Sequence, residues 1–146
     1  MEANPAPSPN PKPEHIKDLL GQCRVVAVVG LSPDPARDSH RVAAYLKERG
    51  FRVIPVNPKA ETILGQKCYP DLPSIPEPVD IVDVFRSSEH VPEIARQAVA
   101  ARAKCLWLQQ GVRNEEAAAY ARVCGVLVVQ DRCLKVDHQM LMGYQV

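Results

Sequence analysis

Short apolar runs rich in β-branched residues alternate along this chain with helical segments, and this alternation constrains the fold more than any other feature. Residues 24–30 read RVVAVVG, and similar runs follow at residues 51–58, 79–85, 104–109 and 126–130. A continuous apolar run of this length is typical of a strand buried on both faces of a parallel sheet. The pattern therefore predicts an α/β fold with three layers, in which about five strands form a doubly wound parallel sheet with helices on both faces.

Helical patterns occupy most of the connections between these runs. Polar caps and terminal glycines predict helices at residues 14–21, 39–50, 87–103, 114–125 and 133–143. In this interpretation Gly21 ends the first helix, Ser87 or Ser88 caps the third, and Asn114 caps the fourth. The connection between residues 57 and 79 is longer and rich in proline, and we expect a helical turn at residues 72–75.

The length of 146 residues fits one compact domain, and 46% of the residues are apolar, which is enough for a core. Residues 1–13 carry a proline at every second position from Pro5 to Pro13. Such a segment forms no helix and has little to bury. We therefore expect a disordered, proline-rich arm at residues 1–13 ahead of a single domain at residues 14–146.

Composition argues against several classes of protein. A net charge of +1 is far from the strongly basic balance of a nucleic-acid-binding domain. The chain has no apolar run long enough for a membrane span and no apolar core of a signal peptide near its start. Its 5 cysteines lack metal-ligand spacing, as in reduced cytosolic proteins. We expect a cytoplasmic protein that binds no nucleic acid, membrane or metal.

The carboxyl ends of parallel strands form the edge of the sheet where ligands bind. After the first strand, the turn that starts at Gly30 keeps only the first glycine of a dinucleotide fingerprint. The second strand ends in Asn57–Pro58, where a nicotinamide carrier would place a carboxylate for the ribose. Both departures from the fingerprint argue against binding of NAD or FAD.

The same edge offers polar and basic groups instead. Ser32 can donate to an oxygen, and the helix that starts near Ser39 directs backbone N–H groups toward an anion. Four basic residues follow these strand ends: Arg37, Arg41, Lys59 and Arg86. If they share one rim, they suit a ligand with several phosphate charges. Nearby acidic residues leave open the alternative of ordinary surface charge.

Motifs in order along the chain, among them VAVVGLS, SHRVAAYLKERGFRVIPVNP, WLQQGV and QDRCLKVDH, resemble the small CoA-binding protein family. These proteins are single-domain relatives of the CoA-binding domain of the succinyl-CoA synthetase α subunit. The resemblance covers roughly residues 16–143. It implies a Rossmann-like domain that binds coenzyme A, free or acylated, along the strand ends. The synthetase's catalytic ligase domain has no counterpart in the motifs, so the resemblance implies binding without catalysis.

Motif by motif, the resemblance assigns cofactor-binding roles to the strand ends. His40 stands where this family commonly has an aromatic residue, which is a departure from its pattern. Together with the basic rim, the predicted cofactor-binding residues are Gly30, Leu31, Ser32, Arg37, Ser39, His40, Arg41, Asn57, Pro58, Lys59, Phe85, Arg86, Gln109 and Gly111. No residue is predicted to be catalytic.

Two other functions stay open from the sequence. The chain could be an NAD(P)-dependent or CoA-transferring enzyme that uses Cys133, although helical spacing directs His138 away from Cys133. It could also lend a CoA site to a separate catalytic subunit, or act as a homodimer. The sequence predicts that Trp107 is a core residue of a strand, and that Asp80 and Asp83 point to opposite faces and form no acid–base pair.

Overall fold

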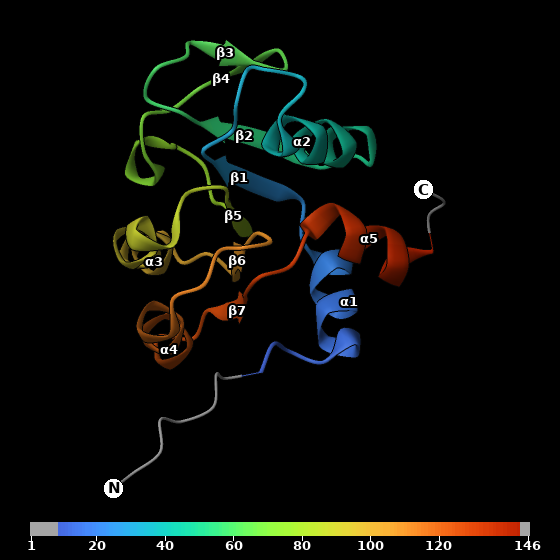
Figure 1. Ribbon diagram of the computed structural model, residues 1–146, viewed down its shortest axis with the longest axis vertical. Coiled ribbons are helices and arrows are strands. Elements are labelled where there is room, and N and C mark those ends of the chain that lie inside the picture. Colours follow the sequence, from blue (N-terminus) through green and yellow to red (C-terminus); the bar gives the residue numbers. More distant parts are fainter. Residues whose placement is uncertain (1–8, 144–146) are drawn as a thin grey trace, which may run out of the picture.

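The computed structural model describes residues 9–143 of the chain (Figure 1). Within these residues, five parallel strands form one sheet in the order β2-β1-β5-β6-β7. The strands are β1 (Val25–Val29), β2 (Arg52–Val56), β5 (Ile81–Val84), β6 (Cys105–Leu108) and β7 (Leu127–Val129). Each lies within one of the five apolar runs, which confirms the predicted parallel α/β fold.

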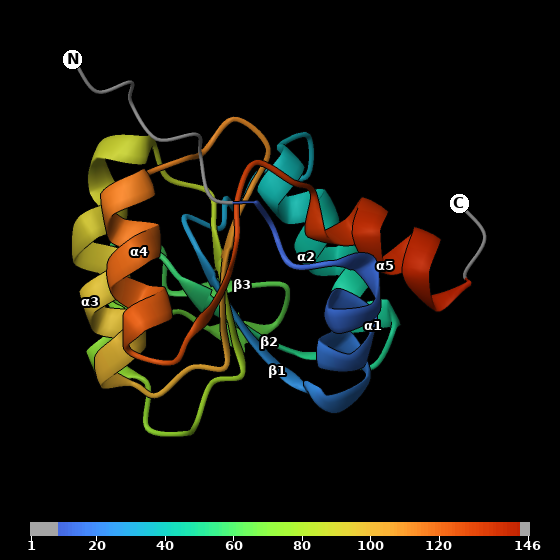
Figure 2. The same cartoon turned by 90° about the horizontal axis from the view of Figure 1, so that it is seen from below.

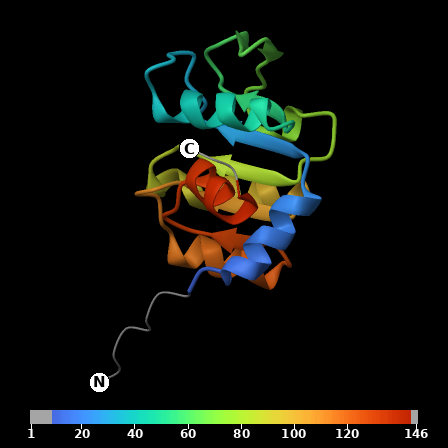
Figure 3. The ribbon, with the colours of Figure 1, turned by 90° about the vertical axis from the view of Figure 1, so that its right-hand side faces the viewer.

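Helices cover both faces of this sheet (Figure 2). One face packs against α3 (Val91–Ala100) and α4 (Glu115–Val123), whose alanines and valines join Val82, Val84 and Leu106 in one core cluster. The other face packs against α1 (Pro13–Gln22), α2 (Asp38–Glu48) and α5 (Leu134–Met142). Figure 3 shows α5 and α1 close together over this second face. The fold is a Rossmann-like, three-layer sandwich.

Several local predictions hold. The side chain of Asn114 caps α4 by accepting from Ala117 N, and Trp107 is fully buried in β6. A 3₁₀ turn at Leu72–Ser74 occupies the predicted position in the long connection. That connection also holds a small antiparallel hairpin, β3 (Thr62–Ile63) and β4 (Gln66–Lys67).

The ends of α1 and the start of α3 differ from the sequence-based expectation. Helix α1 continues through Gly21 to Gln22, and it begins at Pro13, a residue assigned above to the arm. Just before it, the Asn10 side chain exchanges two hydrogen bonds with the backbone of Gln130. Residues 1–8 of the predicted arm lie outside the described residues. A predicted serine cap of α3 is wrong, because a 3₁₀ turn at Ser88–His90 precedes the helix and neither serine side chain caps it.

The strand order places the functional edge. From β1 the chain crosses by α2 to β2, and then returns to the other side of β1 to form β5. The order reverses at β1 and β5, and a doubly wound sheet opens a crevice at the carboxyl ends of such strands. The side chains that follow β1, β2, β5 and β6 therefore meet at this edge.

Candidate functional site

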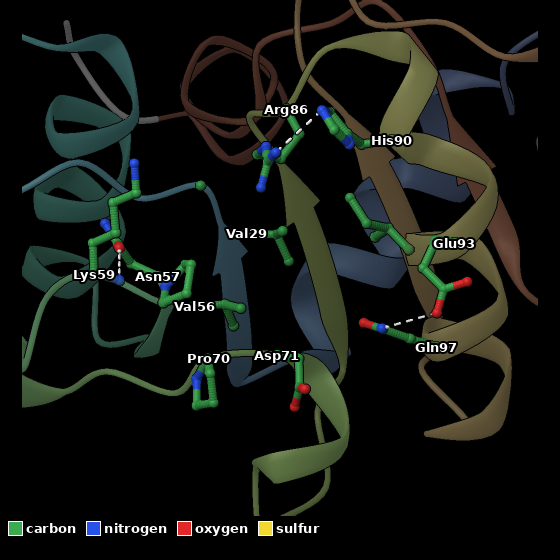
Figure 4. Close-up of a pocket in the computed structure, with 13 residues that line it drawn as sticks. Val29, Val56, Asn57, Lys59, Pro70, Asp71, Arg86, His90, Glu93 and Gln97 are labelled. Atoms are coloured by element: carbon green, nitrogen blue, oxygen red, sulfur yellow. Dashed lines mark hydrogen bonds between the residues drawn. The ribbon is translucent and has the colours of Figure 1, made fainter.

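Two pockets lie at the carboxyl edge of the sheet. Pocket A, with a volume of about 470 Å³, extends from the ends of β1 and β2 to α3 (Figure 4). Pocket B, of about 430 Å³, lies between the start of α2, the ends of β5 and β6, and the start of α5. The consecutive residues Phe85 and Arg86 line pocket B and pocket A respectively. The two pockets are therefore neighbours on either side of the β5 end.

Gly30 forms the turn after β1 and lines pocket A. Its backbone has φ of +87°, and its N–H donates to Val56 O at 3.0 Å. A Cβ at this position would lie 2.8 Å from Phe85 O and 3.1 Å from Arg86 Cδ. The site therefore needs glycine for two reasons, a left-handed conformation and the close approach of the β5 end.

The loop after Gly30 is fastened to the first turn of α2. Ser39 Oγ accepts from Ser32 N at 2.9 Å, and His40 Nδ1 lies 2.9 Å from Ser32 O. Since a carbonyl oxygen only accepts, His40 Nδ1 carries a proton in this contact. The Ser32 hydroxyl accepts from Asp34 N and keeps its own hydrogen to donate. The predicted residues Ser39 and His40 hold the loop, and they line neither pocket.

Asn57 links the ends of β1 and β2. Its side-chain amide donates to Leu31 O at 3.0 Å, and its side-chain oxygen accepts from Lys59 N at 2.8 Å. One side chain thus fixes both the turn after β1 and the basic segment after β2. Leu31 itself is fully buried, so only its backbone faces this network.

The structure divides the predicted basic rim. Lys59 and Arg86 line pocket A, whereas Arg41 lines pocket B, where its guanidinium donates to Asp38 and to Ala36 O. Arg37 is exposed and lines neither pocket. The basic side chains are therefore divided between two adjacent pockets and do not line a single one.

Pocket A also contains residues that the sequence analysis missed. His90 belongs to the turn before α3, and Glu93, Ile94 and Gln97 lie along α3 itself. Arg86 Nη2 lies 3.1 Å from His90 Nε2, and because arginine only donates, this nitrogen of His90 accepts. The missed residues are three or four positions apart, so they share one face of the helix that follows the third predicted strand. That spacing is the sequence pattern from which this side of pocket A could have been predicted.

Pocket B has a polar floor. Gln109 is 4% exposed, and its side-chain nitrogen donates to Asp83 Oδ1 at 2.7 Å. Asp83 is fully buried, its second oxygen has no hydrogen-bond partner within residues 9–143, and burial raises its pKa to about 7. The other wall residues are Asp38, Arg41, Val42, Phe85, Gln110, Cys133, Lys135, Val136 and Gln139.

Two further expectations concern Gly111 and Cys133. Gly111 lies outside both pockets, where its N–H donates to Asp131 Oδ1 at 2.6 Å. Cys133 precedes α5 at pocket B, but His138 is buried and its Nδ1 lies 2.6 Å from the Tyr45 hydroxyl. Cys133 and His138 therefore do not form a nucleophile–base pair, as their helical spacing predicted.

Asp80 and Asp83 are also separated. Asp80 accepts from the backbone N–H groups of Arg24 and Val25 at the opposite edge of the sheet, so it supports the start of β1. Over residues 9–143, no helix has the length and apolar character needed to cross a membrane. The same part of the chain holds no group of three or more His, Cys, Asp or Glu arranged for a metal ion.

Comparisons with known proteins agree with this architecture. The chain is 42% identical over 129 residues to the Bacillus subtilis protein YneT, covering 88% of this chain and 96% of YneT. It is 38% identical over 71 residues to acetate–CoA ligase [ADP-forming] II of Archaeoglobus fulgidus. This match covers 47% of the present chain and only 10% of the ligase.

A solved structure, a hypothetical protein from Pyrococcus horikoshii, superposes with a TM-score of 0.90 at 38% identity and covers 98% of this chain and 100% of that one. A protein from Thermus thermophilus superposes with a TM-score of 0.85 at 38% identity, covering 89% of this chain and 98% of that chain. Residues 24–139 match the family model described as a CoA binding domain. The chain therefore belongs to the CoA binding domain family.

Proposed function

We propose that this protein binds coenzyme A, free or acylated, across the two pockets and does not itself catalyse a reaction on it. The observation that carries this proposal is the pair of adjacent cavities on either side of the β5 end, one lined by Arg86 and the other by Phe85. Coenzyme A is an elongated molecule with a phosphorylated adenosine at one end and a thiol-tipped arm at the other. Two adjacent pockets with different linings suit such a ligand.

In this proposal, pocket A receives the adenosine and its 3′-phosphate. Its floor is apolar, with Val29 and Val56 from the strand ends and Ile94 from α3. Lys59 and Arg86 supply donors on one side of that floor, and His90 accepts from the Arg86 guanidinium there (Figure 4). A flat ring can lie on the floor while the phosphate accepts charge-assisted hydrogen bonds from the cations.

The diphosphate then crosses the turn after Gly30. Ser32 donates its hydroxyl hydrogen here, and the first turn of α2, starting at Asp38, presents N–H groups that have no intrahelical acceptor. Arg41 adds a positive charge on the pocket B side of the same turn. Arg37 precedes α2 and completes the cationic surroundings of this crossing.

The pantetheine arm enters pocket B, along Phe85 and toward Gln109. Its two amide groups need both donors and acceptors, and Gln109, Gln110 and Gln139 offer such groups. Cys133 lies at the same pocket, which is the reason to test the alternative of an enzyme that uses its thiol.

Thermal unfolding with four ligands tests the proposal. A ligand at a free concentration of one hundred times its Kd raises the free energy of unfolding by about 2.7 kcal/mol. We expect CoA and acetyl-CoA to raise the melting temperature, and NAD and NADP to leave it unchanged. A shift with NADP and none with either CoA species would overturn the proposal.

A charge-neutral variant locates the site. Arg86→Gln removes a phosphate contact while keeping a hydrogen-bond donor, and such charged bonds contribute about 1.5–3 kcal/mol. We expect the Kd for CoA to rise at least tenfold. Lys17→Gln is the matched control, because Lys17 is exposed on α1 and lines neither pocket. Equal CoA affinity in the two variants would contradict the assignment of pocket A.

A further inference from the structure

We propose that pocket A distinguishes a 6-aminopurine from a 6-oxopurine, and that Gln97, oriented by Glu93, makes this distinction. The inference deepens the proposed function and rests on it for the placement of the adenine ring. It assigns a specificity role to two residues of α3 that lie outside the predicted site.

Pocket A is polarised from one end to the other. In Figure 4, Lys59, Arg86 and His90 lie toward one end, while Asp71 and Gln97 lie toward the other, with Val29 and Val56 between them. The first end offers donors to an anion. The second end offers oxygen acceptors, so it suits a ligand edge that donates.

The orientation of the Gln97 amide follows from its neighbour. Gln97 Nε2 donates to Glu93 Oε1 at 3.3 Å, one helical turn away. A carboxylate can only accept, so the nitrogen must face Glu93 and the amide oxygen must face away. In Figure 4 that oxygen projects into the pocket, toward the side of Val56.

Glu93 is itself held in its charged form. Arg96 donates to Glu93 Oε2 from Nη2 at 2.7 Å and from Nε at 3.2 Å. These bonds, with that from Gln97, lower the pKa of the Glu93 carboxyl. Rotation of the Gln97 amide would set two oxygens against each other, so the acceptor is fixed toward the pocket.

Asp71 reinforces the acceptor character of this end. One of its oxygens accepts from Ser74 N and Ser74 Oγ, which fixes the side chain at the start of the 3₁₀ turn. A ring that lies on the apolar floor with its phosphate at the cationic end would turn its far edge toward Gln97 and Asp71. The 6-amino group of adenine donates there. Hypoxanthine has an oxygen at C6 and its hydrogen on N1, so its C6 position would face the acceptors without a hydrogen.

Binding of paired nucleotides tests the inference. Calorimetric Kd values are measured for CoA and its deaminated (hypoxanthine) analogue, and for AMP and IMP. The 6-oxo form loses a half-exposed hydrogen bond and sets its oxygen against the acceptors, and together these effects predict about a tenfold preference for each amino form. Gln97→Leu is expected to bind both members of each pair equally, with an unchanged melting temperature because Gln97 is only half-buried.

A second variant tests the orienting role of Glu93. In Glu93→Gln the neighbour can either donate or accept, so the Gln97 amide is free to rotate and the preference should fall to about threefold or less. Glu48→Gln, on the exposed end of α2, is the control and should keep the wild-type preference. Full preference in Glu93→Gln would overturn the orienting role.

The outcomes separate this inference from the proposed function. Equal binding of CoA and its deaminated analogue by the wild-type protein would overturn the inference and leave CoA binding intact. A preference for AMP over IMP without measurable CoA binding would support the inference at pocket A and overturn the proposed function. Retention of the preference in Gln97→Leu would overturn the inference, and binding of none of the four ligands would overturn both.

Discussion

The side-chain nitrogen of Gln109 donates to Asp83 Oδ1 at 2.7 Å, directly beneath the floor of pocket B. Asp83 stands in the middle of the sheet, where its neighbours in register are Val28 and Trp107. Burial raises the pKa of its carboxyl to about 7, so at mildly acid pH the buried acid is neutral. Because the bond turns the Gln109 nitrogen toward Asp83, the Gln109 oxygen faces away from Asp83 and can accept from a ligand in pocket B.

Stability should therefore decrease as pH rises from about 4 to 7 through the contribution of Asp83. In the unfolded chain this carboxyl has lost its proton above its ordinary pKa of 3.8, whereas the folded chain keeps the proton until about pH 7. The native state then binds more protons, so the free energy of unfolding falls with pH in this window, by up to about 1.4 kcal/mol for each pH unit.

Asp83→Asn removes this dependence. We expect the difference in the free energy of unfolding between the variant and wild type to shift in favour of the variant from pH 4.5 to pH 8, by about 2 kcal/mol or more. Urea unfolding at both pH values measures the difference. Burial also lowers the pKa of His138, which gives wild type and variant the same opposite slope below pH 6.5, so the difference isolates Asp83. An identical pH profile in the two proteins would show that Asp83 keeps an ordinary pKa.

Gly30→Ala should destabilise the fold and weaken CoA binding together. The added methyl group would lie 2.8 Å from Phe85 O, in a backbone with φ of +87°. We expect a loss of about 2–4 kcal/mol, from backbone strain and overpacking combined. Gly50→Ala is the matched control, since its φ is +93° with no atom within 4 Å of the new methyl, and it should cost only about 1 kcal/mol. Equal losses in urea unfolding would contradict the role of the close contact.

Asn57→Ala should weaken CoA binding more than it weakens the fold. The variant loses the bonds to Leu31 O and Lys59 N, which fix the loops on either side of the phosphate path. We expect about tenfold weaker binding in calorimetry and a stability loss of about 1–2 kcal/mol. Asn57→Asp keeps the acceptor for Lys59 N, but it sets a carboxylate oxygen against Leu31 O and adds a negative charge beside the phosphate path. It should therefore weaken CoA binding at least as much as Asn57→Ala does. CoA affinity equal to wild type in Asn57→Ala would argue against this path.

Cys133→Ser should leave the Kd for CoA unchanged if the protein only binds its ligand. Cys133 lines pocket B, but His138 is engaged with Tyr45 and cannot act as its base. Mass spectrometry of wild type and variant after incubation with acetyl-CoA would detect a covalent adduct. An adduct present in wild type and absent in Cys133→Ser would favour the enzyme that uses this thiol.

Local patterns in the sequence determined the elements and the edge that carries the site. The β-branched runs predicted the buried strands, and the positions that follow those runs predicted Gly30, Asn57, Lys59, Phe85, Arg86 and Gln109, because parallel strands end at one edge of a sheet. Of these, Gly30, Asn57, Lys59 and Arg86 line pocket A, and Phe85 and Gln109 line pocket B. Helix ends were less accurate, as Gly21 and the serines before α3 show, since packing decides where a helix starts and stops.

Only the tertiary structure decided how these residues are shared between cavities. The division of the basic rim depends on which helix covers which face of each strand, and nothing local to Lys59 or Arg41 encodes that. The same holds for the bond from Gln109 to Asp83, 26 residues apart, and for the placement of Gln97 at the wall of pocket A. Contacts between elements distant in the chain arise from sheet order and helix packing, and a local pattern carries no information about either.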